Sequence, residues 1–312
     1  MPLDLSDSEP AFLIDGSIYI FQSHFSPHVE CVDKAGNELS AVYGFTQFLL
    51  QFLRRVKPSR IAVALDESLF CGFRHQLCPK YKSNRELPDE NLAMQLKACA
   101  EVSAILGLAT YSSKVYEADD IIGTLAKIAR RDCQHKVPIH IVSKDKDLAQ
   151  LLETEEDCLW DYSSNRKRYP KDIFADFGVW PAQIPDFLGL AGDAVDCISG
   201  VPGIGPVKAV ELLKSFDSIE GVYQNLDKLG ELPVRGAKRL ASMLQEHRDL
   251  AELSKTLATI VCEVEDSAEE FANIGFSQMK RTPISLEALE HFLIEYGFQE
   301  NESRRLLTQI NY

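Results

Sequence analysis

Residues 108–131, LATYSSKVYEADDIIGTLAKIARR, place an acidic cluster between two apolar patterns. Residues 108–112 have the character of a buried strand, and residues 119–131 carry apolar side chains at helical spacing. Three carboxylates stand at the junction: Glu117, Asp119 and Asp120. Capping the helix needs only one of them. Because three adjacent carboxylates repel one another, the pattern indicates a positive charge bound among them, with plain helix capping as the alternative.

The same strand-then-helix order continues on both sides of this stretch. Short apolar runs predict further strands at 11–14, 60–65, 138–143 and 158–162, and helical patterns occur at about 41–56, 90–106 and 146–152. Strands that alternate with helices imply parallel crossovers and a sheet covered on both faces. We therefore predict an α/β domain with a parallel-sheet core.

Acidic residues also follow the other predicted strands. Asp15 follows the first strand, Asp66 the second, and Asp145 and Asp147 the strand at 138–143. Ligands of open parallel sheets bind outside the carboxyl ends of the strands. Any one of these residues is more often a cap than a ligand, but four acidic strand ends predict carboxylates that converge on one edge.

The C-terminal half changes to helical patterns with tight turns. Its central feature is residues 192–216, GDAVDCISGVPGIGPVKAVELLKSF. Gly203 and Gly205 allow a hairpin, and Pro206 suits the first position of a helix. Such a turn offers backbone N–H groups to a phosphate, with Lys208 beside it. This region predicts a helix-hairpin-helix that grips a nucleic-acid backbone without reading bases.

Oxygen ligands dominate the predicted site. Two more acids, just before the hairpin, complete a set of nine carboxylates: Asp15, Asp66, Glu117, Asp119, Asp120, Asp145, Asp147, Asp193 and Asp196. A site of oxygen ligands without His or Cys suits Mg²⁺ or Mn²⁺. Two such ions would support in-line displacement at a phosphodiester. The sequence therefore favours a metal-dependent nuclease.

The overall charge at first argues against this substrate. The chain has 33 basic and 47 acidic residues, a net charge of −14 at pH 7, whereas nonspecific nucleic-acid binding needs Lys and Arg. Residues 72–85, GFRHQLCPKYKSNR, are an exception, because they contain no acid and interleave cations with aromatic residues. This window suits phosphate and base contacts, although a solvated charged loop is the alternative.

Several stretches in this order resemble the bacterial 5′ nuclease (flap endonuclease) family, which includes the 5′–3′ exonuclease domain of DNA polymerase I. They are LIDGS, AVYGF, FRHQLCPKYKSNR, YEADD, SKDKDLAQLL and GLAGDAVDCISGVPGIGPVKAVELL, between about residues 11 and 216, with a weaker likeness at 286–298. No polymerase region follows, so the chain resembles a free-standing member.

The resemblance implies a fold. It implies a PIN-like nuclease core at 11–178, with a helical arch at about 72–97 over the active site. It also implies a helical DNA-binding region at 179–298, with a helix-hairpin-helix (helix-three-turn-helix) at about 186–215.

The resemblance also implies roles for single residues. All nine carboxylates match the family's metal-site acids, which hold two Mg²⁺ or Mn²⁺ ions, and a monovalent cation such as K⁺ is implied at the hairpin. Arg74, Lys82 and Arg85 match arch residues that act on the scissile phosphate and the 5′ strand. Tyr81 would stack beside them. The hairpin residues that would contact DNA are Gly203, Gly205 and Lys208.

The implied activity is removal of 5′ flaps and 5′ nucleotides from branched or nicked duplex DNA by a two-metal mechanism, in DNA replication and repair, by a monomer. Two positions depart from the family pattern: Asp196-Cys197 stands in place of Asp-Asn, and Ser199-Gly200 in place of Pro-Gly. The ligand Asp196 is kept, and we expect the lost amide to loosen the loop before the hairpin.

Three other functions would use part of this pattern. A phosphatase with an aspartyl nucleophile needs a second Asp two residues after Asp15, where this chain has Ser17. A PIN-domain ribonuclease would be shorter and would lack the hairpin. A noncatalytic DNA-junction protein would keep the hairpin but has no need of the full acid set.

Composition suggests the compartment. No apolar run reaches the roughly 18 residues of a membrane span, and the N-terminal segment is acidic rather than basic. The eight cysteines lack metal-ligand spacing, as expected for reduced thiols. We expect a soluble, cytoplasmic protein with no membrane partner.

Overall fold

The computed structural model describes residues 9–68, 71–134, 136–264 and 274–310. The chain forms two compact units, and each one is assembled from segments that are distant in sequence. The sheet unit comprises residues 1–69, 87–144 and 261–312, and the helical unit comprises residues 70–86 and 145–260.

The core of the sheet unit is a parallel sheet. Its strands are β1 (Ala11–Asp15), β2 (Ile61–Asp66), β3 (Ala109–Ser113) and β4 (Ile139–Val142), in the order β3-β2-β1-β4. Leu13 pairs with Ala62 on one side and with Ile141 on the other. The α/β class and the parallel pairing predicted from alternating strands and helices are confirmed.

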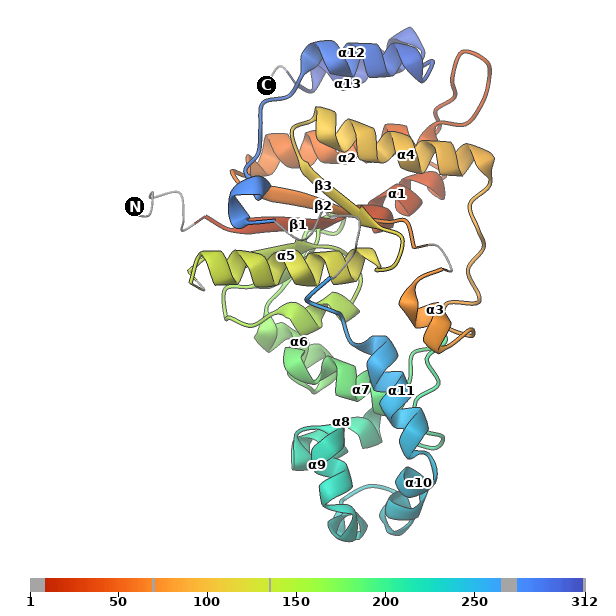
Figure 1. Cartoon of the computed structure of the whole chain (residues 1–312), viewed down its shortest axis with the longest axis vertical. Coiled ribbons are helices and arrows are strands. Elements are labelled where there is room, and N and C mark those ends of the chain that lie inside the picture. The colour runs from red at the N-terminus through yellow and green to blue at the C-terminus, as the bar shows by residue number, and fades with distance from the viewer. Residues whose placement is uncertain (1–8, 69–70, 135, 265–273, 311–312) are drawn as a thin grey trace. The chain divides into compact units, whose positions relative to one another are not determined.

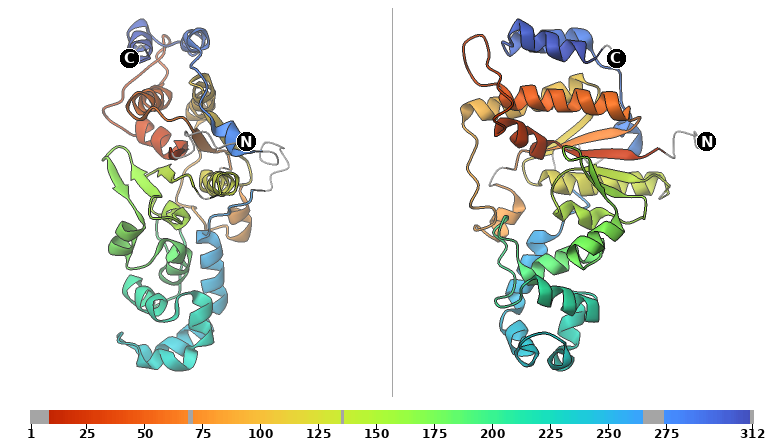
Figure 2. Two further views of the ribbon diagram at one scale, coloured as in Figure 1. Left: turned by 90° about the vertical axis from the view of Figure 1, so that its left-hand side faces the viewer. Right: turned by 180° about the vertical axis from the view of Figure 1, so that it is seen from behind.

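Helices cover both faces of this sheet, which explains why its central strands β1 and β2 are apolar up to their terminal Asp residues. Those next to the strands are α1 (Gly16–His24), α2 (Ser40–Val56), α4 (Glu90–Ile105) and α5 (Ala118–Asp132). Figure 1 shows α2 and α4 on one side of the strands and α5 on the other, and the left view of Figure 2 shows the same helices end-on. Phe45, Phe52 and Ile121 are fully buried in the two layers.

Three elements after the helical unit complete the sheet unit. They are η6 (Phe276–Met279), a 3₁₀ helix, and the helices α12 (Leu286–Glu295) and α13 (Glu300–Thr308). Arg60, just before β2, forms an antiparallel bridge with Lys280. The guanidinium of Arg60 also lies over the ring of Phe276, 4.2 Å from its centroid. These contacts fasten the C-terminal segment to the sheet.

The helical unit begins with α3 (Phe73–Leu77), the 3₁₀ helix η2 (Asp147–Leu151) and an antiparallel hairpin of β5 (Cys158–Asp161) and β6 (Arg166–Arg168). The helices that follow are α6 (Pro170–Phe177), η3 (Pro181–Gln183), α7 (Ile184–Ala191), α8 (Pro206–Phe216), α9 (Ile219–Gln224), η4 (Leu226–Glu231), η5 (Ala237–Arg239), α10 (Leu240–Glu246) and α11 (Arg248–Ala258). Helices α7 and α11 pack together at its centre.

Two local predictions differ from the structure. The helical pattern at 146–152 forms a 3₁₀ helix, and β6 was not predicted, because its sequence Arg-Lys-Arg has no apolar residue. The predicted arch at 72–97 contains α3 and the start of α4, which belong to different units. Among the helices of the described ranges, none has the length and hydropathy to cross a bilayer.

Candidate active site

The carboxyl end of β1 carries the first predicted acid. Asp15 is 6% exposed, and its Oδ1 accepts a hydrogen bond from the backbone N–H of Ile18, 3.2 Å away, which caps α1. Its Oδ2 accepts a hydrogen bond of 2.8 Å from the hydroxyl of Ser143, the residue after β4. The ends of two adjacent strands are therefore joined through this carboxylate.

The end of β2 is tied to the same edge. Asp66 Oδ1 accepts a 2.7 Å hydrogen bond from the N–H of Ala118, in the first turn of α5. The N–H of Asp66 in turn donates to Ser17 Oγ at 2.9 Å. Asp15 and Asp66 therefore both lie at carboxyl ends of strands in the sheet unit, and their convergence on a common metal stays a prediction.

The acidic cluster at 117–120 divides into two kinds of residue. Asp120 is fully buried, and its two carboxylate oxygens accept hydrogen bonds from the backbone N–H groups of Glu117 (3.1 Å) and Val261 (2.8 Å). These contacts favour the capping role for Asp120 over that of a metal ligand. Glu117 is buried and Asp119 is half-buried at the start of α5.

A second group of acids lies in the helical unit, around Lys146. The Lys146 ammonium contacts Asp193 Oδ2 and lies 3.4 Å from Asp147 Oδ1. Asp145 Oδ1 accepts a 2.9 Å hydrogen bond from the N–H of Asp147, and Asp193 Oδ1 accepts one of 2.8 Å from the N–H of Val195. One cation thus sits between two of the carboxylates that the sequence predicts.

Asp147 has the most perturbed carboxyl of this group. Burial, followed by the negative charge of Asp145, raises its pKa from 3.8 to about 7. Its buried Oδ1 accepts no hydrogen bond. Burial alone would lower the pKa of Lys146, but the attraction of Asp147, Asp193 and Asp145 outweighs it and raises that pKa. The site therefore holds more negative charge than its own residues neutralise.

Asp196 is the anchor for a turn that carries two predicted catalytic cations. Arg85 Nη2 donates to Asp196 Oδ1 at 2.9 Å, and Lys82 Nζ lies 3.7 Å from Asp196 Oδ2. The backbone N–H of Lys82 also donates to the carbonyl of Asp196 at 3.0 Å, and Lys82 adopts a left-handed conformation with φ of 49°. The structure brings Lys82, Arg85 and Asp196 together.

Arg74 and Tyr81 are placed differently from their predicted roles. Arg74 is 3% exposed and donates to the carbonyls of Leu257 (3.0 Å) and Thr259 (2.7 Å), at the end of α11. Tyr81 is 2% exposed, with the ring of His75 packed against it at 5.4 Å. These contacts favour packing roles, because neither side chain offers an exposed surface to a phosphate or a base in this arrangement.

The predicted hairpin before α8 is present. Gly203 has a φ of 82°, and Gly205 is the N-cap of α8, with room for a close approach because a Cβ there would meet nothing within 4 Å. Lys208 Nζ donates to the carbonyl of Gly203 at 2.8 Å, while Ile204 is buried and anchors the turn. The glycine turn and its lysine therefore form one local structure.

The loop before the hairpin contains the two departures from the family pattern. Asp193 and Ile198 exchange two backbone hydrogen bonds of 2.8 Å, which close the loop, and Cys197 within it has a φ of 56°. Left-handed conformations favour Gly and Asn over Cys. Gly200 has a φ of 62°, and a Cβ there would lie 2.3 Å from the backbone nitrogen of Gly192. Only glycine fits at 200.

Sequence reasoning missed two contributors to these groups, Ser143 and Lys146. Each has a sequence signal, because Ser143 directly follows a strand and Lys146 stands between two predicted acids. Within the described ranges, no three His, Cys, Asp or Glu side chains form a ready-made metal-ligand set. The hydrogen bonds and ion pairs above explain this, since many of the carboxylate oxygens already contact cations or backbone N–H groups.

Comparisons with known proteins identify relatives of this chain. Residues 10–178 match the family described as 5′-3′ exonuclease, N-terminal resolvase-like domain, and residues 179–282 match 5′-3′ exonuclease, C-terminal SAM fold. A 5′-3′ exonuclease of Buchnera aphidicola (from Schizaphis graminum) is 32% identical over 293 residues, covering 94% of this chain and 98% of its own. DNA polymerase I of Bacillus subtilis is 34% identical over 283 residues, and the match covers 88% of this chain but 30% of the polymerase.

Solved structures show the same fold. The T5 D15 protein co-crystallised with metal ions has a TM-score of 0.64 at 16% identity, covering 96% of this chain and 99% of that one. The catalytic core of Rad2 in complex with DNA substrate has a TM-score of 0.60 at 15% identity, covering 99% and 95%. The predicted class, a PIN-like α/β core with a parallel sheet followed by a helical region, is confirmed.

Proposed function

This chain belongs to the 5′–3′ exonuclease family and is a nuclease of that family, and from this premise we propose that it hydrolyses DNA phosphodiester bonds at 5′ flaps and 5′ ends with the help of two divalent ions. The single observation that carries metal dependence is Asp147. Its buried Oδ1 accepts no hydrogen bond and lies 3.4 Å from the Lys146 ammonium. Burial and the negative charges of Asp145 and Asp193 nearby still keep the pKa of Asp147 raised, so this carboxylate favours a hard cation.

The donor set fits Mg²⁺ or Mn²⁺. Each unit contributes candidate ligands other than the capping Asp120: Asp15, Asp66, Glu117 and Asp119 in the sheet unit, and Asp145, Asp147, Asp193 and Asp196 in the helical unit. When bound, two such ions polarise a phosphate oxygen and lower the pKa of a water molecule. Mg²⁺ keeps several waters, so some of these acids would act through water.

The protein's own cations supply the remaining chemistry. Lys82 and Arg85 are held beside Asp196 by charge and by the backbone bond from Lys82. A phosphate that competes for their N–H groups would be oriented by a charge-assisted, partly bidentate contact. In this proposal they position the scissile phosphate and neutralise the charge that develops on it.

Duplex DNA would be held by the hairpin before α8, where backbone N–H groups and Lys208 offer contacts without base recognition. A monovalent cation such as K⁺ at this turn belongs to the same proposal. We assign residues 11–178, with an arch at 72–97, to the nuclease core and residues 179–298 to DNA binding. The substrate would be branched or nicked duplex DNA, bound by one copy of the chain.

Cleavage of a labelled 5′-flap duplex tests the proposal. We expect Mg²⁺-dependent cutting near the junction, no cutting in excess chelator, and loss of cutting in Asp147→Asn. Asp176→Asn is the matched control, because this half-exposed carboxylate pairs with Arg166 on α6 and β6 instead. Tight flap binding without cutting in Mg²⁺ or Mn²⁺ would contradict the proposal and favour a noncatalytic junction protein.

A further inference from the structure

An open cleft in the helical unit lies outside the proposed metal site and the hairpin. It has a volume of about 720 Å³. It is bordered by α6, by the turn into η3, by the C-terminal end of α8 and by the end of α9 with η4. Its chemically distinctive lining residues are Phe174, Trp180, Gln183, Lys214, Asp217 and Lys228. Nothing in the proposed reaction uses them.

Two aromatic side chains form one wall of this cleft. Phe174 is 42% exposed and Trp180 is 47% exposed, and their rings stack with centroids 4.6 Å apart and planes inclined by 27°. The backbone around the pair is fixed, because α6 ends at Gly178 in a left-handed conformation and the backbone N–H of Trp180 donates to Gln183 Oε1 at 3.0 Å. An exposed, pre-ordered aromatic surface of this kind suits stacking against a planar ligand.

Other residues that line the cleft carry polar groups. The Gln183 amide donates to the carbonyl of Asp217 at 2.8 Å and to its carboxylate Oδ1 at 3.1 Å, which fixes the end of α8. Lys228 Nζ donates to Asn225 Oδ1 at 2.7 Å and is exposed. Lys214 is also exposed, and among the described residues it forms no ion pair. Two ammonium groups and one carboxylate thus line the same cleft as the aromatic pair.

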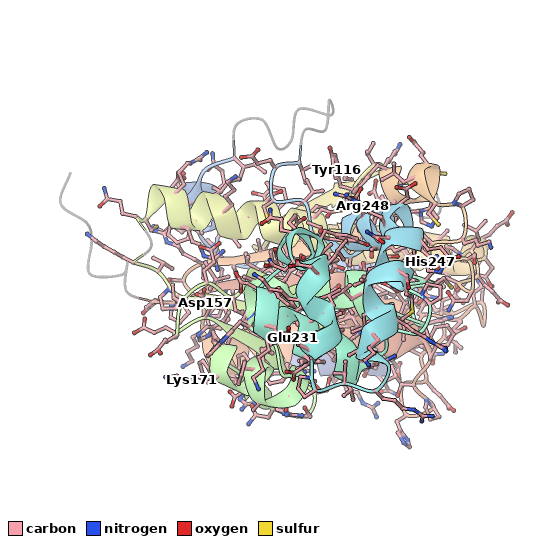
Figure 3. All side chains as sticks on the ribbon, turned by 90° about the horizontal axis from the view of Figure 1, so that it is seen from below. Tyr116, Asp157, Lys171, Glu231, His247 and Arg248 are labelled. Atoms are coloured by element: carbon pink, nitrogen blue, oxygen red, sulfur yellow. The ribbon has the colours of Figure 1, made fainter. Side chains whose placement is uncertain are left out.

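Neighbouring charges on α6 are already paired. Lys171, which lies at the edge of the helical unit in Figure 3, pairs with Glu155 at 2.9 Å. Asp176 pairs with Arg166 at 2.9 Å. Lys214 and Lys228 are therefore the cations of this cleft that remain available to an anion.

We propose that this cleft binds one nucleotide of a single-stranded nucleic acid. The base stacks on Phe174 and Trp180, and the phosphate contacts Lys214 and Lys228. The 11 residues of α8 separate the cleft from the hairpin by roughly 16 Å at 1.5 Å per residue. We rely on the proposed nuclease function only for choosing a nucleic acid rather than a peptide as the occupant.

Intrinsic fluorescence gives a local test, because the chain has two tryptophans and Trp160 is 4% exposed, so Trp180 reports on the cleft. The titrant is single-stranded hexadeoxyadenylate in excess EDTA, where no cleavage is needed. We expect saturable quenching in the wild type. Phe174→Ala keeps the reporter and should weaken binding about fivefold or more, since one stacked base contributes about 1–3 kcal/mol. Lys214→Ala also keeps the reporter and should weaken binding because it removes a phosphate contact. Phe25→Ala, which removes a 74% exposed ring from the sheet unit, should not.

Quenching that is absent, or unchanged in both Phe174→Ala and Lys214→Ala, would overturn the proposal. Quenching by an apolar peptide but not by the oligonucleotide would also overturn it, because the cleft would then dock a protein. Lys214 is exposed, so its variant should fold as the wild type does. Flap cleavage in Mg²⁺ is measured separately, and its absence with intact quenching in EDTA would count against the proposed nuclease function and not against the cleft.

Discussion

Replacing Lys146 with methionine should lower the stability of the metal-free protein and raise its affinity for divalent ions. The Lys146 ammonium contacts Asp193 and lies 3.4 Å from Asp147 Oδ1. One contact at that distance is worth about 5 kcal/mol at an effective dielectric constant near 20. Because the Lys146 side chain is 37% exposed, solvent screens most of this. The expected loss in the free energy of unfolding is about 2 kcal/mol, which lies between the loss of an exposed ion pair and that of a broken buried ion pair.

Thermal unfolding in EDTA measures the first effect, and calorimetric titration with Mn²⁺ measures the second. For a chain of 312 residues, the loss should lower the Tm by about 3 °C. Without the competing ammonium, Mn²⁺ affinity should rise about tenfold, equivalent to about 1.4 kcal/mol. Lys171→Met is the control, because its pair with Glu155 is exposed on both sides, and it should change neither quantity. An unchanged Tm together with unchanged Mn²⁺ affinity would refute a counter-ion role for Lys146.

Three further predictions concern the same unit. In EDTA, the wild-type free energy of unfolding should fall by at most about 4 kcal/mol as the pH rises from about 4 to 7. The reason is that Asp147 has a pKa of about 7 in the folded protein but 3.8 in the unfolded chain, so only the folded state keeps the proton in this range. Urea unfolding at several pH values measures this slope, and Asp147→Asn should remove it. Cys197→Asn should raise the free energy of unfolding by up to about 1 kcal/mol and so raise the Tm, since Asn tolerates a φ of 56° better than Cys. A lower Tm would contradict this interpretation of the loop. Gly200→Ala should lower the free energy of unfolding by more than about 2 kcal/mol, because its Cβ would collide with Gly192, and a near-neutral result would show that the loop can open.

The sequence predicted the strand positions well because buried strands are rich in apolar residues, as β1, β2, β4 and β5 are. The strand β3 also lies at its predicted position, although it is mostly half-buried and ends in Ser-Ser. It also placed Asp15 and Asp66 at strand ends, where their role depends on topology alone. It did not separate capping acids from candidate ligands. Asp120 is engaged by the N–H of Val261, which is distant in sequence, so no local pattern could reveal it.

The basic window at 72–85 also shows that a local sequence pattern cannot reveal contacts with residues distant in sequence. Cations and aromatic residues at 72–85 predicted a surface for DNA, yet Arg74 is buried against the end of α11 and Tyr81 is buried beside His75. Only Lys82 and Arg85 lie with an acid of the predicted site. Burial within such a window is decided by residues about 180 positions away, as in the 183-residue separation of the Arg74–Leu257 bond.

The contacts of Asp196 couple the binding of a divalent ion to the binding of a substrate phosphate in the proposed reaction. Lys82 and Arg85 neutralise this carboxylate here. A divalent ion bound by Asp196 would take over that neutralisation, which makes both cations available to a phosphate. The reverse also holds, because a phosphate that draws Lys82 and Arg85 away leaves Asp196 in need of a cation. Binding of the two ligands is therefore expected to be mutually favourable, with the same coupling factor in either order. Flap affinity measured with and without non-cleaving Ca²⁺ should rise with the ion in the wild type and rise less in Arg85→Ala. An equal rise in both proteins would show that the coupling does not pass through the Asp196 pair.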